Sequence, residues 1–365
     1  MKTRLRRDVP KGRFGGTQVI IAAALALLVS VFLGVTIGAV RVSVAEVLGI
    51  LARDILGIGV GPSHVFREPE GLKASIILQI RLPRVVLSGL VGASLAVAGA
   101  TFQGIFRNPM ADPFVIGVSS GASLGAVLAI VLGLQAGFLG LGAVPLMAFT
   151  GALGSILLVY SISRVQGRLP VLTMLLAGIA VGSFLSALVS LAVYFSNQQI
   201  HQVVFWLMGG FSGATWQYVR LAVPYVAVGC AACLVYARDL NAMVLGEDTA
   251  VHLGVDTEWV KRALLGAASL LTATAVATSG LIGFVGLIVP HVIRLVAGPD
   301  HRVLIPASAL AGAAFLVTAD AMARTVIAPT ELPVGILTSM FGGPFFIYLL
   351  RRRKNLAYFG SPGGE

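Results

Sequence analysis

Long, unbroken apolar runs constrain the fold of this chain more than any other feature of its sequence. About 20 apolar residues, rising 1.5 Å each, cross the ~30 Å hydrocarbon core of a bilayer. The runs are continuous and do not alternate with a period of two, so they predict helices and not a transmembrane barrel. We expect an all-α, polytopic membrane protein of about ten spans, at residues 17–40, 82–106, 114–133, 141–163, 171–195, 216–236, 260–280, 283–297, 303–323 and 333–350.

The composition agrees with a membrane protein. Hydrophobic residues make up 57% of the 365 residues and charged residues 11%, whereas soluble domains carry about 25% charged residues. The net charge of +11 would indicate nucleic acid in a soluble protein, but here the basic residues gather at the ends of the apolar runs and at the termini. We therefore expect a lipid bilayer, and no nucleic acid, as the partner of this surface.

The basic residues also predict the orientation of the chain. Loops between alternate spans carry Lys or Arg, as cytoplasmic loops do, whereas the loops near 134–140 and 196–215 carry neither. We expect a basic cytoplasmic N-terminal tail at 1–16, a transmembrane domain at 17–350 and a cytoplasmic C-terminal tail at 351–365.

One exterior region departs from this charge rule. The basic residues that would face outward between the first two spans and at the start of the second are Arg41, Arg53, Arg67, Lys73, Arg81 and Arg84. Because arginine offers a planar fork of donors to carboxylates, the cluster indicates an acidic partner on the outer face. The alternative is that the predicted topology is wrong.

The interior segment 238–261 mixes charged and apolar residues. Its pattern predicts two short amphipathic helices with a turn at Gly246, ending near Gly254. A helix pair that exposes apolar side chains suits docking to a soluble partner. The alternative is a solvated loop.

The sequence lacks the motif of a nucleotide-driven motor. A P-loop requires G-x-x-x-x-G-K-[ST], and none of the five lysines, Lys2, Lys11, Lys73, Lys261 and Lys354, follows such a pattern. A pump built on this chain therefore needs a separate ATPase subunit.

Candidates for catalysis or metal binding are weak. Residues 117–121 match G-x-S-x-G, but they begin a membrane helix with no strand before them, so a membrane enzyme acting through Ser119 is the less favoured alternative. Cys230 and Cys233 lie inside an apolar run and predict packing. His201 and Met208 are better explained as surface or core residues than as substrate contacts. We expect no catalytic residue and no metal site.

Ionisable residues within the spans are few. Asp320 and Arg324 are four residues apart and could pair on one helix face, with Glu331 near the start of the last span. A structural pair is favoured over a proton or sodium relay. An ion-coupled secondary transporter nevertheless remains the alternative function.

Small residues recur at helical spacing on two spans. This small-xxx-small pattern predicts tight helix crossings, and it occurs at Ala96, Ala100 and Gly104, and at Gly117, Gly121 and Gly125.

Several long motifs resemble one family. They are RLPR (81–84), GATFQGIFRNPMADPFVIGVSSGASLGA (99–126), MGGFSGATW (208–216), LGEDTAVHLGV (245–255), GLIGFVGLIVPHVIRL (280–295), GPDHRVLIP (298–306) and ELPVGILTSMFGGPFFIYLLRR (331–352). Together they resemble the FecCD family, the permeases of type II ABC importers for iron chelates and cobalamin. Motifs of this length and order are far more specific than a single short pattern.

The resemblance implies the architecture and partners of the chain. We expect a type II ABC importer permease fold with ten helices per subunit, and a homodimer with the substrate path on its two-fold axis. Two ATPase subunits would bind ATP and Mg, an extracytoplasmic substrate-binding protein would dock outside, and this chain would hold no cofactor. The cargo would be an iron chelate (siderophore or haem) or cobalamin, and the location the bacterial inner (plasma) membrane.

The resemblance also implies roles for individual residues. Docking of the binding protein is expected at Arg81, Arg84 and Arg324. Contact with the ATPase is expected at Leu245, Gly246, Glu247 and Gly254. The cytoplasmic gate is expected at Asn108, Pro109 and Met110, with a second gate position where this chain carries Pro170 and Val171 in place of the family's short polar pair.

Overall fold

The computed structural model describes residues 14–38, 42–54, 69–134, 142–166, 169–196 and 199–353. Within these ranges, seven helices are long and apolar enough to cross a membrane: α1 (Gly16–Thr36), the continuous helix Leu72–Ile105 that contains α4 (Leu82–Ile105), α6 (Ala143–Ser163), α7 (Val171–Tyr194), α9 (Trp216–Val235), α12 (Thr257–Ser279) and α14 (His301–Ala323). Three shorter apolar helical segments are α5 (Val118–Val131), α13 (Val285–Ala297) and the part Val334–Tyr348 of α15 (Val334–Arg353). The all-α fold is confirmed, and each of the ten expected spans contains one of these helices.

The second span begins earlier than expected. Helix α3 (Pro69–Ser75) and a π-helical stretch (Ile76–Arg81) run directly into α4, so one helix extends from Pro69 to Ile105, and its candidate span begins at Leu72. The charged side chains of Lys73 and Arg81 hid this extension in the sequence, because charges usually mark the end of a span.

The third span is shorter than expected. A 3₁₀ turn (Pro113–Ile116) and Gly117, whose φ is +81°, come before α5. The 14 residues of α5 cover about 21 Å, less than the hydrocarbon core. Irregular backbone at membrane depth must be enclosed by protein, and Pro113 and Ile116 are indeed buried.

Two short helices lie outside the expected spans. They are α2 (Val44–Asp54) and α8 (Ile200–Met208). The sequence pattern did not predict them as spans, because a membrane span needs an apolar run of about 20 residues.

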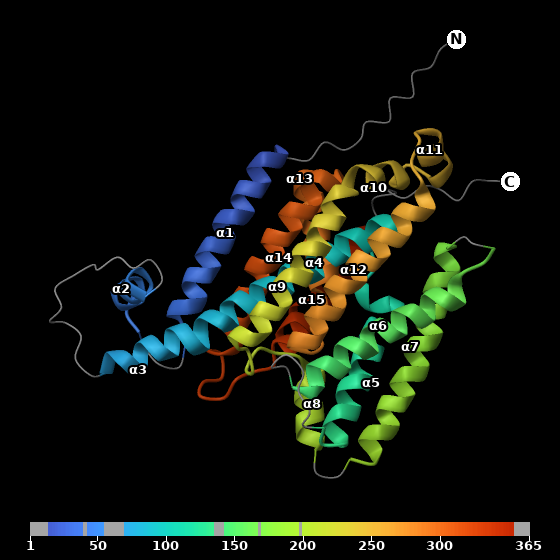
Figure 1. The fold of residues 1–365 in the computed structure, drawn as a ribbon. Coiled ribbons are helices and arrows are strands. Elements are labelled where there is room, and N and C mark those ends of the chain that lie inside the picture. Colours follow the sequence, from blue (N-terminus) through green and yellow to red (C-terminus); the bar gives the residue numbers. More distant parts are fainter. Residues whose placement is uncertain are drawn as a thin grey trace.

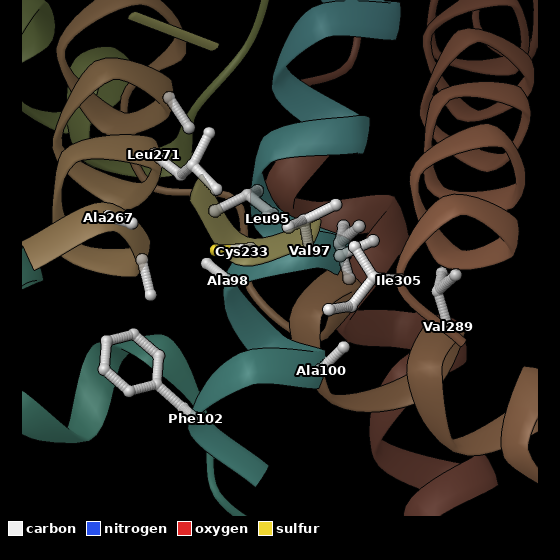
Figure 2. Packing of buried hydrophobic residues seen from close by; sticks show 14 of the residues in the cluster. Leu95, Val97, Ala98, Ala100, Phe102, Cys233, Ala267, Leu271, Val289 and Ile305 are labelled. Atoms are coloured by element: carbon white, nitrogen blue, oxygen red, sulfur yellow. The ribbon is translucent and has the colours of Figure 1, made fainter. Parts of the chain in front are cut away.

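Helix α4 passes through the middle of the bundle and packs against α9, α12, α13 and α14 (Figure 1). Figure 2 shows its side chains, including Leu95 and Phe102, in one apolar cluster with Cys233 of α9, Leu271 of α12 and Ile305 of α14. Helices α5, α6 and α7 pack together at one side, and α5 and α6 contact α12 (Figure 1). The core therefore surrounds α4, and α7 presents mostly exposed apolar side chains.

Backbones touch where small residues meet. A Cβ atom added at Gly99 of α4 would clash with the carbonyl oxygen of Gly286 of α13, and one added at Gly121 of α5 would clash with that of Gly151 of α6. Close approach of this kind allows the dispersion contacts that hold helices together in lipid. The tight crossings predicted on the second and third expected spans, which contain α4 and α5, are confirmed.

Two glycines of α6 provide a direct test of this packing. We expect Gly151→Ala to destabilise the protein by about 1–3 kcal/mol, as overpacking does, because the new methyl meets the carbonyl of Gly121. Gly154→Ala is the matched control, since no atom lies within 4 Å of its added Cβ. Thermal unfolding in detergent micelles measures both variants. Equal melting temperatures would show that this backbone contact does not contribute to stability.

Candidate functional site

An amphipathic helix hairpin lies at one end of the bundle. It consists of α10 (Ala237–Val244), which contacts α4, α12 and α14, and α11 (Glu247–His252), which contacts α12 (Figure 1). The turn falls at Gly246, where φ is +132°, and α11 is followed by Gly254, where φ is +84°. Two helices with a turn at Gly246 were predicted from the sequence, and the structure confirms them.

The hairpin separates buried from exposed apolar residues. Leu240 and Met243 of α10 face the bundle and are 0% and 2% exposed, whereas Leu245 and Leu253 are 72% and 65% exposed. Exposed leucines at a helix turn leave apolar surface available to another protein. The hairpin therefore has an exposed apolar tip, formed by Leu245 and Leu253, and a base that Leu240 and Met243 bury against the bundle.

The base of α10 is tied to α14 through Asn241. Its Nδ2 donates to Asp300 Oδ1 at 2.7 Å, and its Oδ1 accepts the backbone N–H of His301 at 2.9 Å. Asp300 also caps α14 by accepting the N–H of Arg302. Hydrogen bonds from Arg302 hold the pKa of Asp300 well below its usual range, so the cap is ionised at neutral pH.

Lys261 ties α11 to α12. Its Nζ lies 2.7 Å from Glu247 Oε2 and 3.2 Å from Glu258 Oε1, and the residue is 3% exposed. The sequence showed Lys261 only as the last residue of the charged segment 238–261 and as a lysine outside any P-loop pattern, and it did not predict this buried role. A glutamate three residues before it on the same helix was the available signal.

The residues expected at the gate lie on two separate elements. Asn108 follows α4, and its Oδ1 accepts the N–H of Met110 at 2.9 Å. Pro109 and Met110 lie beside His291 of α13. Pro170 caps the N-terminus of α7 and Val171 is its first residue. Their gating role stays a prediction.

The three arginines expected to dock a partner lie at the opposite end of the bundle from the hairpin. Arg81, Arg84 and Arg324 are only 4%, 7% and 7% exposed. Arg81 Nη1 donates to the carbonyl oxygens of Val35 and Thr36, both at 3.0 Å. It therefore caps the C-terminal end of α1, where carbonyl groups lack helical partners.

Arg84 and Arg324 share one buried carboxylate. Arg84 Nη2 lies 2.9 Å from Asp320 Oδ1, and Arg324 Nε lies 3.1 Å from Asp320 Oδ2. Arg84 Nη1 also pairs with Glu331 Oε2 at 2.8 Å, and Arg324 Nη2 donates to the carbonyl of Gly34 at 2.9 Å. We call Arg84, Asp320, Arg324 and Glu331 the buried charge cluster.

The cluster explains the ionisable pair seen in the sequence. Asp320 and Arg324 do pair as predicted, but Arg84, from 236 positions away, completes the site. Asp320 is 0% exposed, and a buried carboxylate is stable only when it is paired and hydrogen-bonded. Here the guanidinium groups of Arg84 and Arg324 both pair with it, so the cluster links α4 to α14 and stabilises the bundle.

A cavity of about 460 Å³ opens beside the cluster. Arg84 and Glu331 lie at one side, and Trp206, Tyr218 and Thr278 line the rest. It lies where α8, the start of α9 and the end of α12 meet the start of α15.

The remaining candidates show no reactive arrangement. The Ser119 hydroxyl is buried without a hydrogen-bond partner among the described residues, and Cys230 and Cys233 are free thiols. His201 is exposed on α8, which ends at Met208. Across the described part of the chain, no group of three or more His, Cys, Asp or Glu could hold a metal ion.

The ten apolar helices in the part of the chain that the structure describes, with the amphipathic hairpin at one end, define a polytopic membrane protein. The chain belongs to the FecCD transport family, whose model matches residues 26–352. The resemblance seen in the motifs is therefore confirmed over nearly the whole chain.

Individual relatives agree with the family. The chain is 49% identical to the cobalamin import system permease protein BtuC of Halobacterium salinarum, over 92% of this chain and 89% of the relative. It is 44% identical to the hemin transport system permease protein HmuU of Yersinia pestis, over 76% of this chain and 84% of the relative. Both relatives are transport permeases, which agrees with the expectation of a transport subunit and not an enzyme.

Solved structures show the same fold. An inward-facing conformation of an ABC transporter assigned to the metal-chelate type superposes with a TM-score of 0.78 at 30% identity, over 92% of this chain and 99% of the other. PsaBC from Streptococcus pneumoniae in complex with Fab superposes with a TM-score of 0.52 at 16% identity, over 79% and 94%. The second likeness concerns the fold alone.

The buried charge cluster leads to a stability prediction. Asp320→Asn leaves two buried guanidinium groups without their shared carboxylate, and we expect a loss of about 3–5 kcal/mol, as for other broken buried pairs. Glu331→Gln is the matched control. Its side chain is 42% exposed, so we expect a loss of about 1 kcal/mol or less. Thermal unfolding in micelles compares the two variants. Equal losses of stability would contradict a structural role for the pairing of Asp320 with the two arginines.

Proposed function

We propose that this chain is the membrane-spanning subunit of an ATP-binding cassette importer. The importer would carry an iron chelate (siderophore or haem) or cobalamin, handed over by an extracytoplasmic binding protein, into the cytoplasm. The chain would work as a homodimer in the bacterial inner membrane, with both termini in the cytoplasm. Separate subunits would bind ATP and Mg, and this chain itself would hold no cofactor.

The hairpin α10–α11 is the observation that carries this proposal. A transporter driven by a separate motor needs a surface where the motor docks, and the exposed Leu245 and Leu253 provide one on an anchored base. Gly246, Glu247 and Gly254 shape the same tip. The names of the relatives support the cargo class, since one imports cobalamin and one transports hemin.

In this mechanism ATP binding closes the motor subunits, and the hairpin passes that movement to the gates at Asn108–Met110 and at Pro170 and Val171. The ion-coupled alternative finds less support, because Asp320 is closed off by two arginines. A relay carboxylate must bind and release its ion during transport.

The hairpin can be tested with one polar substitution. We expect Leu245→Ser to reduce co-purification with the candidate ATPase subunit by about tenfold, corresponding to 1.4 kcal/mol, because it removes a leucine at the centre of the apolar tip. Leu132→Ser is the matched control. Leu132 is 65% exposed and is the C-cap residue directly after α5, which contacts α8 at the opposite end of the bundle from the hairpin.

Uptake into proteoliposomes completes this test. ATP-dependent uptake that falls with Leu245→Ser and not with Leu132→Ser supports the importer. If the unaltered chain binds no ATPase and uptake follows an ion gradient instead, the importer proposal is wrong and the secondary transporter takes its place.

The binding protein would dock at Arg81, Arg84 and Arg324 by exchange of partners. In this structure all three guanidinium groups already bind groups of the same chain. Glu331 is the partner that a docking protein could replace most easily, because its side chain is the more exposed of the two carboxylates in the cluster. It lies in the segment between α14 and α15 and binds Arg84. A glutamate of the binding protein would take its place.

This exchange makes an unusual prediction. Glu331→Gln removes a competing carboxylate, so we expect the binding protein to dock up to about tenfold more tightly, a gain of about 1.4 kcal/mol. Surface plasmon resonance on the reconstituted permease measures the affinity, and raising the salt should reduce it. Unchanged or weaker docking would show that Arg84 does not exchange Glu331 for a partner carboxylate.

A further inference from the structure

A chain of polar contacts links the hairpin to the start of α7. The first link is the pair between Lys261 Nζ of α12 and Glu247 Oε2, the first residue of α11, at 2.7 Å. The second is the pair between Lys261 Nζ and Glu258 Oε1 at 3.2 Å. The third is the hydrogen bond that the backbone N–H of Leu169 donates to Glu258 Oε2 at 3.3 Å.

The third link reaches the N-terminus of α7. Leu169 is 2% exposed and immediately precedes Pro170, which caps the helix. Because proline has no N–H, the amide of Leu169 is the last backbone donor before α7 begins at Val171. Glu258 therefore holds the backbone at the point where α7 starts.

The central lysine has little freedom to leave its partners. Lys261 is 3% exposed, and removing an ammonium group from water costs several kcal/mol unless charged partners compensate. Glu247 and Glu258 supply that compensation, and both are partly exposed. Asp256 fixes the same turn of α12 by accepting the N–H of Trp259 at 3.0 Å. A displacement of α11 therefore draws Lys261 and its turn with it.

The two helices of the hairpin are anchored to different elements. Helix α10 binds the start of α14 through Asn241. Helix α11 reaches α12 and then α7 through Lys261 and Glu258. The hairpin thus has a separate mechanical connection to α7, the element that carries Pro170 and Val171.

We propose that Lys261 and Glu258 are positioning residues that pass the movement of α11 to the N-terminus of α7, and so couple ATP hydrolysis to opening at Pro170 and Val171. This inference rests on the proposed function, since the movement originates in an ATPase bound to the hairpin. Lys261 and Glu258 act through α7, and their effect is on how much transport each ATP produces.

The test measures uptake per ATP hydrolysed. The full chain is reconstituted in liposomes with its ATPase and its binding protein, using cyanocobalamin and ferric hydroxamate as separate probes. We expect Lys261→Met to lower uptake per ATP by about tenfold, within the ~5–150-fold range typical of coupling between sites, with ATP hydrolysis within about twofold of the unaltered chain. Lys261→Arg keeps a cation that reaches both carboxylates and should restore most of the coupling.

A second variant separates coupling from stability. Glu258→Ala cuts the connection to α7 while the pair between Lys261 and Glu247 remains, and we expect the same loss of uptake per ATP. Hydrogen–deuterium exchange at the first turn of α7 should respond to nucleotide in the unaltered assembly, and this response should be absent in Lys261→Met and Glu258→Ala. A purely structural role would lower the melting temperature without removing the nucleotide response.

Glu46→Gln is the matched control. It also removes a lysine–glutamate pair of 2.7 Å, with Lys73, at the opposite end of the bundle. We expect uptake per ATP to match that of the unaltered chain.

The outcomes separate this inference from the proposed function. Normal uptake per ATP and a normal nucleotide response in Glu258→Ala would overturn the connection to α7 and leave the importer intact. Failure of the unaltered chain to bind any ATPase would overturn both. If Lys261→Met does not assemble, Glu258→Ala and Lys261→Arg still decide the question.

Discussion

The close approach of backbones around α4 is the constraint on which the rest of the structure depends. Lipid tails are as apolar as the helices, so burial of apolar surface drives their association only weakly, and contact between backbones must supply much of the stability. Gly92 and Gly99 of α4 bring in the carbonyls of Gly312 and Gly286. Once α4 is held in this way, its two ends have defined neighbours, and a polar site is built at each end.

The two polar sites differ in a way that matches their proposed tasks. At one end, Asp320 is enclosed by Arg84 and Arg324, and the charges are satisfied almost wholly within the chain. At the other end, Lys261 is buried while Glu247 and Glu258 stay partly exposed. The first arrangement stabilises the bundle, because a buried pair is costly to break. The second arrangement can move together with the hairpin, whose apolar tip is exposed.

Several features of the site were open to prediction because their signals are local. The hairpin was predicted from glycines at 246 and 254 and from amphipathic spacing, which depend only on neighbouring residues. A tight crossing of α5 was predicted from glycines four residues apart, and the structure gives α6 as its partner. The short α5 was missed, because the apolar run around it does not show that Gly117 and the preceding turn leave the helix.

The sequence by itself determined that the chain is an all-helical membrane protein, how many apolar helices it has, which helix faces pack closely, and to which family it belongs. These properties follow from local hydrophobicity, residue size and motif order. Only the tertiary structure decided which charges are partners: Arg84 with Asp320, and Glu258 with Lys261 and the amide of Leu169. The physical reason is that the free energy of a charge depends on burial and on neighbours brought from distant parts of the chain, and only folding supplies both.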